Sequence, residues 1–128
     1  MAHVNPPEMD GWNLALRFGL ELVALAGIGA AAWKVGSGGM RWVLVVVVPV
    51  VAAAIWGVFN VLDDPSRSGA APVEVPGWTR FAIELLILGC GVAGLAFSGR
   101  RGLAVGLSVL VVVHYATSWS RVTWLLDA

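Results

Sequence analysis

The stretch RFGLEL, residues 17–22, and its near-copy RFAIEL, residues 80–85, decide how the rest of this chain is interpreted. Each stretch lies near the start of a long apolar segment, where an arginine and a glutamate are costly to bury. The two copies begin 63 residues apart, which is about half of the 128-residue chain. This spacing indicates a tandem duplication, with one Arg–Glu pair in each half.

The composition is typical of a membrane protein. Hydrophobic residues make up 59% of the chain and charged residues 12%, against about 45–50% and about 25% in soluble domains. The mean hydropathy is +0.84. The net charge is zero, so the chain has no basic surplus of the kind that binds nucleic acid, and we expect no nucleic-acid partner. The single cysteine, Cys90, lies in an apolar run, and we interpret it as a packing residue.

Four apolar segments predict an all-α membrane protein with four transmembrane helices, built as two tandem-repeated helical hairpins. Each segment has about 20 residues, which at about 1.5 Å per residue matches a hydrocarbon core of about 30 Å. We expect the spans at residues 13–33, 42–62, 78–97 and 103–119. A polar cap, residues 1–12, then precedes a single domain, residues 13–126, with repeat 1 at about 13–62, a loop at 63–77 and repeat 2 at about 78–126.

Prolines and glycines mark the irregular parts of this plan. Pro49 lies inside the second span and predicts either a kink or a packing contact there. The segment 60–77 contains three prolines and two glycines, which predicts a long loop without regular structure. The tail, residues 120–128, carries Arg121 and Trp124 and is expected to reach the membrane interface.

The distribution of Lys and Arg predicts an orientation. The short turns 34–41 and 98–102 carry Lys34, Arg41, Arg100 and Arg101. The opposite side has only Arg67 and Arg121 as exposed cations. The excess of positive charge therefore favours cytoplasmic turns, with the termini and the long loop outside. An aromatic belt supports the span boundaries, since six tryptophans lie near predicted ends: Trp12, Trp33, Trp42, Trp78, Trp119 and Trp124.

The repeated Arg–Glu pair suggests a buried cluster. A repeat of two spans makes the first and third helices parallel. Arg17 would then contact Glu84, and Arg80 would contact Glu21, in a four-charge cluster. Two interpretations stay open: a clamp that keeps the hairpins in register, or a binding or transport site. His114, in the fourth span, either relays protons at this site or donates one hydrogen bond to a neighbouring helix.

Small residues recur at helix-packing spacing, where close backbone contact replaces the hydrophobic drive that lipid cannot supply. They serve either packing within one chain, which we favour, or contact between protomers. In the first span they are Gly27, Gly29 and Ala31; in the third, Gly89, Gly91, Ala93 and Gly94; in the fourth, Gly102 and Gly106.

The loop and the remaining polar residues give little sign of catalysis. Asp64 and Ser66 fit a turn capped by an aspartate and opened by Pro65, in preference to a cation site. His3, His114 and Cys90 are too scattered for a metal site. We expect neither metal nor cofactor. No nucleophile–base set is present, so an enzyme is the least favoured class.

Three segments resemble a known family: LALRFGLELVALAG at 14–27, WGVFNVLDDPSRSGAAPVEVPG at 56–77 and RFAIELLILG at 80–89. Together they resemble the YrdB-like family of small bacterial integral membrane proteins, a family of unknown function, over residues 13–126. The resemblance implies four helices in a bacterial inner membrane and supplies no activity, substrate or cofactor. The particular sequence of the loop suggests that Arg67 docks a partner or that the loop folds back over the Arg–Glu cluster as a lid.

Two functions follow as hypotheses. The first is a binding or transport module in the lipid bilayer, forming a homo-oligomer, with a site lined by Arg17, Glu21, Arg80, Glu84 and His114. The second is an accessory or structural subunit that docks another membrane protein through the loop residues Asp64, Ser66 and Arg67, with the Arg–Glu cluster as a helix clamp.

Overall fold

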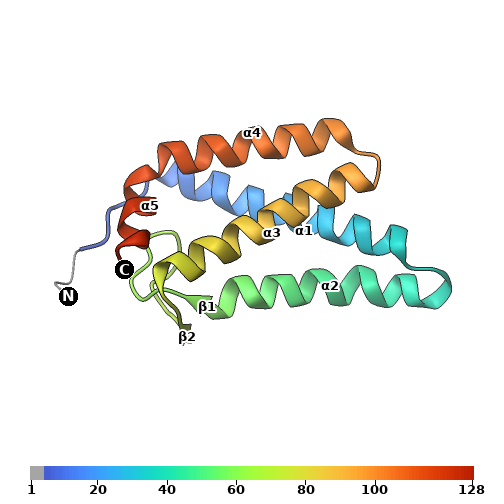
Figure 1. The fold of residues 1–128 in the computed structure, drawn as a ribbon, viewed down its shortest axis with the longest axis horizontal. Helices are drawn as coiled ribbons and strands as arrows, with labels where there is room; N and C mark the ends of the chain where they lie inside the picture. The colour runs from blue at the N-terminus through green and yellow to red at the C-terminus, as the bar shows by residue number, and fades with distance from the viewer. Residues whose placement is uncertain (1–4) are drawn as a thin grey trace.

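The structure is a computed structural model that describes residues 5–128. The described chain is all-helical apart from one pair of two-residue strands (Figure 1). The elements in chain order are α1 (Gly11–Val35), α2 (Gly38–Val58), β1 (Phe59–Asn60), β2 (Val73–Glu74), α3 (Gly77–Phe97), α4 (Arg101–Thr117) and α5 (Trp119–Leu126).

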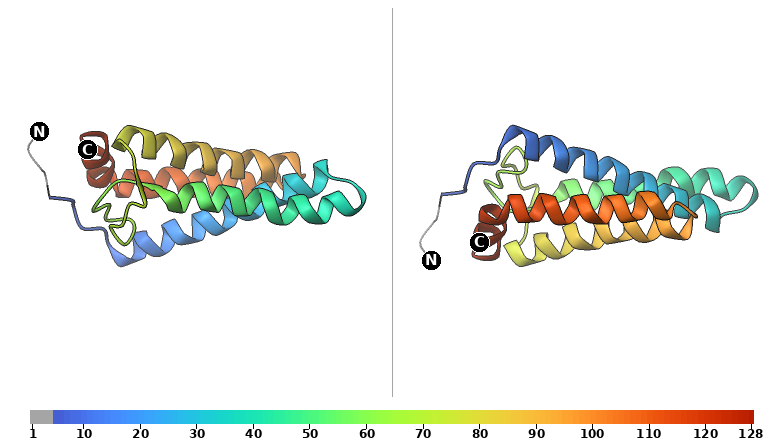
Figure 2. Two further views of the ribbon diagram at one scale, coloured as in Figure 1. Left: turned by 90° about the horizontal axis from the view of Figure 1, so that it is seen from below. Right: turned by 90° about the horizontal axis from the view of Figure 1, so that it is seen from above.

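The four long helices lie along one common axis (Figures 1 and 2). α1 and α2 are antiparallel neighbours, as are α3 and α4, and α1 and α3 run in the same direction. The start of α1, both strands, α5 and the C-terminus lie at one end of the molecule, which we call the capped end. The two helix-connecting turns lie at the other end and are shorter than predicted, at residues 36–37 and 98–100.

Three of the described helices are long and apolar enough to cross a membrane. The apolar windows of α1, α2 and α3 have mean hydropathies of 1.7, 2.2 and 1.8. α4 and α5 pass the same test only as a pair, and they are bent by 73° at their junction. The described chain therefore offers three candidate spans, or four if the bent pair counts as one.

Small residues bring α1 and α3 into close backbone contact. A Cβ atom added at Gly91 would lie 2.5 Å from the Cα of Ala24, and one added at Gly94 would clash with the carbonyl oxygen of Gly27. These residues therefore pack within the chain. By contrast, a Cβ added at Gly102 or Gly106 would meet no described atom within 4 Å beyond its chain neighbours and the backbone of its own helix.

Pro49 marks a packing contact between α1 and α2. A Cβ added at Gly29 would lie 3.3 Å from the Cγ of Pro49, so the proline ring fills the space that this glycine leaves. α2 nevertheless remains the least covered of the three long helices, with 6% of its apolar window buried. Cys90, which we expected to pack in the core, is exposed, because it lies on the outward face of α3.

The second helix ends four residues earlier than predicted, at Val58. The chain becomes extended at Phe59 and pairs in parallel with the loop, in the register Phe59↔Val73 and Asn60↔Glu74. The expectation that residues 60–77 lack regular structure is therefore wrong at Asn60, Val73 and Glu74, which belong to the two strands. The buried Asn60 explains the early end, because its Nδ2 donates a 2.6 Å hydrogen bond to the carbonyl of Gly57.

The tail is a separate helix rather than a continuation of the last span. α4 ends where Ser118 donates its hydroxyl hydrogen to the carbonyl of His114, at 2.6 Å. α5 then crosses the capped end, and its last turn rests on the start of α3, where the N–H of Gly77 bonds the carbonyl of Ala128 at 3.4 Å. An added Cβ at Gly77 would clash with the carbonyl of Leu125. Trp124 is consequently buried rather than interfacial.

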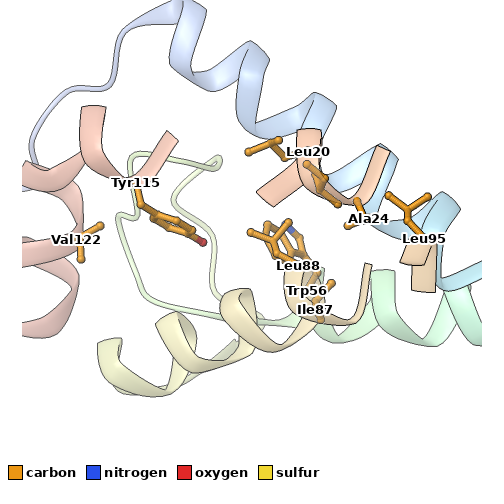
Figure 3. Close-up of a cluster of buried hydrophobic side chains, with 10 residues drawn as sticks. Leu20, Ala24, Trp56, Ile87, Leu88, Leu95, Tyr115 and Val122 are labelled. Atoms are coloured by element: carbon orange, nitrogen blue, oxygen red, sulfur yellow. The ribbon is translucent and has the colours of Figure 1, made fainter. Parts of the chain in front are cut away.

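The hydrophobic core runs between the helices from the middle of the bundle to α5. Figure 3 shows Leu20, Ala24, Trp56 and Leu88 gathered where α1, α2 and α3 meet. Tyr115 lies toward α5, and its hydroxyl points into the bundle. A hydroxyl that points inward from a core position needs a hydrogen-bond partner, and the partner of Tyr115 is the carboxylate of Glu84.

The glycine contact between α1 and α3 yields a matched prediction. Gly91→Ala should lower the free energy of unfolding by about 1–3 kcal/mol, because the added methyl must push α1 away. Gly89→Ala, on the exposed face of the same helix, should leave stability unchanged or raise it by about 0.5–1 kcal/mol. Thermal unfolding of both variants in detergent measures the difference. Equal melting temperatures would contradict the contact.

Candidate functional site

The carboxylate of Glu84 is the centre of a buried polar cluster. It is 0% exposed and accepts six hydrogen bonds. Arg17 donates two, at 3.1 and 2.8 Å, and Arg121 donates two, at 3.0 and 2.8 Å. Arg80 Nε and the hydroxyl of Tyr115 each add one at 2.8 Å. This one anion is therefore shared by three guanidinium groups.

The residues of this cluster come from five different parts of the chain. Arg17 is on α1, Tyr115 on α4 and Arg121 on α5, while Asp64 comes from the loop. Arg80 and Glu84 are four residues apart on α3, a spacing that places both on one face of the helix. The bend before α5 turns the tail back over the capped end and allows Arg121 to reach Glu84. We call Arg17, Asp64, Arg80, Glu84, Tyr115 and Arg121 the Glu84 cluster.

Asp64 fixes the loop to α5. Its carboxylate accepts hydrogen bonds from Arg121 at 2.9 and 2.6 Å, and from the backbone and hydroxyl of Ser66 at 3.0 and 2.8 Å. The Ser66 contacts confirm the predicted aspartate-capped turn. Burial by itself would raise the pKa of Asp64, but the hydrogen bonds and charge of Arg121 outweigh it and lower this pKa below its ordinary value. Asp64 is 1% exposed, so it is not on the outer surface of the loop.

Arg121 is the main residue that sequence reasoning placed wrongly. We expected an exposed cation near the interface, but Arg121 is 0% exposed and is held by Glu84 and Asp64. The physical reason is that a fully buried Glu84 with two arginines still has accepting capacity, and Asp64 adds a second anion beside it.

Trp56 lies against two of the arginines. The Cζ atoms of Arg17 and Arg80 are 4.9 and 4.8 Å from the centroid of its ring, within the range of a cation–π contact. Arg80 also donates to the carbonyls of Trp56, at 2.5 Å, and Phe59, at 2.9 Å, which lie at the end of α2. Three arginines and two carboxylates leave the Glu84 cluster with one surplus positive charge.

His114 extends the network without changing its charge. Arg17 can only donate, so the 3.3 Å contact from its Nη1 makes His114 Nε2 an acceptor. The other ring nitrogen, Nδ1, then carries the hydrogen and donates it to Asn13 Oδ1. Asn13 in turn donates to Thr117 Oγ1 at 2.9 Å. Both nitrogens of a neutral His114 thus have partners, which matches the structural interpretation of this residue.

The expected four-charge cluster forms only in part. Arg17 contacts Glu84, as predicted from the repeat. The predicted contact of Arg80 with Glu21 is wrong, because Arg80 forms its ion pair with Glu84 on its own helix. Glu21 instead faces Arg67 of the loop, at 3.7 Å. Asp64 and Arg121 complete the cluster in place of Glu21.

Glu21 and Arg67 lie at a small cavity beside the cluster, which we call the Glu21 cavity. It has a volume of about 140 Å³ and is lined by Glu21, Leu25, Ala53, Trp56, Gly57, Arg67 and Ile87. The side chains of Glu21 and Arg67 are 22% and 29% exposed. No described residue accepts a hydrogen bond from Trp56 Nε1, although this atom is buried. The loop thus reaches α1 through Arg67, next to Glu21 rather than over Glu84.

Several site residues carried no usable signal in the sequence. Asn13 is a single polar residue at the start of a predicted span, Tyr115 lies next to His114, and Trp56 lies inside the second predicted span, so none of the three belongs to a motif. Within residues 5–128, no group of three His, Cys, Asp or Glu side chains is arranged to hold a metal ion.

Comparison with known proteins places these observations in a family. The model of a family described as "Protein of unknown function (DUF2568)" matches residues 15–112. The chain is 43% identical over 120 residues to "Uncharacterized protein YrdB" of Bacillus subtilis (strain 168), which covers 94% of this chain and 98% of that protein. No solved structure matches the chain.

The two repeated glutamates should differ sharply in their effect on stability. Glu84→Gln removes the shared anion from three buried arginines and should cost about 3–5 kcal/mol of unfolding free energy. Glu21→Gln breaks only a half-buried pair at 3.7 Å and should cost about 0–1 kcal/mol. Thermal unfolding in detergent compares the two variants, and similar losses would show that Glu84 is not the centre of the cluster.

The lowered pKa of Asp64 gives a pH-dependent prediction. Its ionised carboxylate stabilises the fold above its ordinary pKa, near 4, and this contribution is lost as the pH falls through the lowered pKa. Asp64→Asn should therefore melt below the wild type at pH 7, and the two curves should converge in acid. A gap that stays constant down to acid pH would contradict this role.

Proposed function

This chain belongs to the YrdB-like family of unknown function, DUF2568, and from that premise we propose that it is an integral membrane protein that binds a small ligand in the Glu21 cavity. The observation that carries the proposal is the loose pair of Glu21 and Arg67, 3.7 Å apart and partly exposed at the edge of a cavity. In the same molecule, Glu84 has six donors. The unsatisfied pair is the better candidate for an external partner.

The Glu84 cluster serves as the clamp in this proposal. Every oxygen of Glu84 and Asp64 already has protein donors, so these carboxylates have little left to offer a ligand. The cluster links α1, α3, α4, α5 and the loop. Its role is to hold the capped end in one arrangement, so that Arg67 is presented to Glu21.

The arrangement in the membrane is part of the proposal. The chain has four spans, the bent pair α4–α5 supplying the fourth, built as two tandem-repeated hairpins in a bacterial inner membrane. The parallel course of α1 and α3 supports the repeat. The turns 34–41 and 98–102 face the cytoplasm and the termini face outward. The burial of Arg121 supports this orientation, because it removes one of the two cations counted on the outer side.

The position of Glu21 argues for a ligand rather than for structure alone. Glu21 lies ten residues, or about 15 Å, along α1 from its start, and it shares a cavity with Gly57 in the last turn of α2 and with Arg67 of the loop. A partly buried carboxylate there loses hydration, and a single pair at 3.7 Å with partial exposure offsets little of that cost. Ionisable residues within membrane-spanning helices are candidates for functional sites.

Cysteine labelling tests whether the Glu21 cavity admits a polar molecule. In a Cys90→Ser background, Ala53→Cys places a thiol in the cavity lining, and Ala54→Cys places one on the neighbouring exposed position of α2. A water-soluble methanethiosulfonate reacts with the thiolate, which needs a hydrated site. In a bilayer, Ala53→Cys should react and Ala54→Cys should not. Arg67→Gln should speed the reaction at Ala53→Cys severalfold, because the guanidinium partly closes the cavity.

Two results would count against this function. Equal labelling of Ala53→Cys and Ala54→Cys would mean that no cavity distinguishes the two positions. A labelling rate at Ala53→Cys that is unchanged by Arg67→Gln would mean that the loop is not part of the site.

An accessory subunit that docks another membrane protein is the second candidate. The observation that favours it is α2, whose apolar window is 6% buried and offers a long uncovered face. In that case a Glu21→Gln variant keeps its full activity in the host, whereas bulky substitutions such as Val46→Trp and Val50→Trp on the exposed face of α2 abolish it.

A further inference from the structure

We propose that the Glu21 cavity binds a phosphoethanolamine group, a primary ammonium two carbons away from a phosphate. This inference rests on the binding function proposed above and names the chemistry of its ligand. Two sources supply the group: phosphatidylethanolamine of the bilayer and free phosphoethanolamine. The lining of the cavity, its size and the position of its mouth each support the assignment.

The charges of the lining are those of a receptor for a zwitterion. Glu21 offers a carboxylate to an ammonium, and Arg67 offers a guanidinium to a phosphate. The 3.7 Å between them exceeds a hydrogen bond. No described residue hydrogen bonds either side chain, so a ligand that separates this loose ion pair can take up the hydrogen-bonding capacity of both. A ligand that carries both charges can pair with both Glu21 and Arg67. A simple anion is repelled by Glu21, and a simple cation is repelled by Arg67.

The other polar features favour phosphate at the anionic end. Trp56 Nε1 is a buried donor without an acceptor among the described residues, in a tryptophan that lines the cavity. Arg17 and Arg80, which lie against the indole ring, contribute to the surplus positive charge of the Glu84 cluster. A dianionic phosphate or a phosphodiester gains from this field and offers several acceptor oxygens.

The cationic end must be a primary ammonium rather than choline. Quaternary ammonium groups are recognised by aromatic faces, but the ring of Trp56 already lies against Arg17 and Arg80. A carboxylate such as Glu21 instead accepts N–H hydrogen bonds, which only an ammonium with hydrogens can donate. The cavity therefore discriminates between ethanolamine and its trimethylated form.

The size and the mouth of the cavity fit a head group with its chains outside. A volume of about 140 Å³ is well below the roughly 300–1,000 Å³ of a site that encloses a drug-sized ligand. Ala53 lines the cavity and is exposed, and Val50 and Ala54 near it on α2 are apolar and exposed as well. We therefore place the mouth at Ala53, beside the apolar side of α2, where the acyl chains of a lipid would continue.

Short-chain lipids test the assignment on the purified full-length protein in detergent. Dihexanoyl phosphatidylethanolamine should raise the melting temperature and bind about tenfold more tightly than dihexanoyl phosphatidylcholine or phosphatidylglycerol, since each of these loses a charge-assisted hydrogen bond to Glu21. Glu21→Gln should erase this preference and strengthen phosphatidylglycerol binding, because the carboxylate no longer repels the anionic head group. Arg67→Gln should weaken both phosphatidylethanolamine and phosphatidylglycerol.

Matched controls separate these effects from unfolding. Glu74→Gln makes the same substitution at an exposed loop carboxylate and should retain the preference of the wild type. Ala53→Leu narrows the mouth without touching a charge and should reduce binding of all three lipids. Far-UV circular dichroism and gel filtration confirm that each variant is folded.

A measurement with free phosphoethanolamine distinguishes the soluble compound from the lipid as the source of the group. If free phosphoethanolamine stabilises the protein as much as the short-chain lipid does, the acyl chains contribute nothing and the ligand is the soluble compound. A requirement for the chains identifies the lipid.

Equal stabilisation by all three lipids, or a preference unchanged in Glu21→Gln, overturns the proposed ligand. If Ala53→Cys is nevertheless labelled selectively, the binding function stands and only its ligand is wrong. If labelling also fails, both proposals fall.

Discussion

The attraction of one carboxylate, that of Glu84, for three arginines holds the capped end together. Buried charges are tolerated only when they are paired and hydrogen bonded, and here Arg17, Arg80 and Arg121 meet that condition through the same two oxygens. Because these arginines come from three different helices, their mutual arrangement is fixed by a single side chain. The bend before α5 brings Arg121 to this carboxylate, Asp64 ties the loop to Arg121, and Trp56 lies against Arg17 and Arg80.

The motifs at residues 17–22 and 80–85 are similar in sequence but lie in different surroundings. Glu84 is enclosed because the second half of the chain continues into α5, which supplies Arg121. The first half instead continues into the loop, and its Arg67 stops short of Glu21. The same Arg–Glu pattern is thus found in different surroundings because the segments that follow it differ. Glu84 is the centre of a buried cluster, whereas Glu21 has a single loose ion pair beside a cavity.

The sequence predicted the features that depend on local periodicity and on apolar length. The long helices and the capped turn at Asp64 are of this kind, whereas the Arg17–Glu84 contact was predicted from the repeated motif. The burial of Arg121 was not predictable, because the bend at Ser118 depends on hydrogen bonds that no pattern reports. The early end of α2 depends similarly on Asn60, a side chain whose burial is decided by the whole fold. Long-range pairing was visible only where the repeat suggested it.

The docking of α5 on the start of α3 has a consequence for biosynthesis. Arg121 follows every other member of the Glu84 cluster in the sequence and is therefore synthesised after them. Until Arg121 emerges from the ribosome, Glu84 has only Arg17 and Arg80 as guanidinium partners, and Asp64 lacks the arginine that binds it in the folded protein. The four long helices are therefore synthesised before the cluster can close, and the pairing of Asp64 with α5 is a late step in biosynthesis.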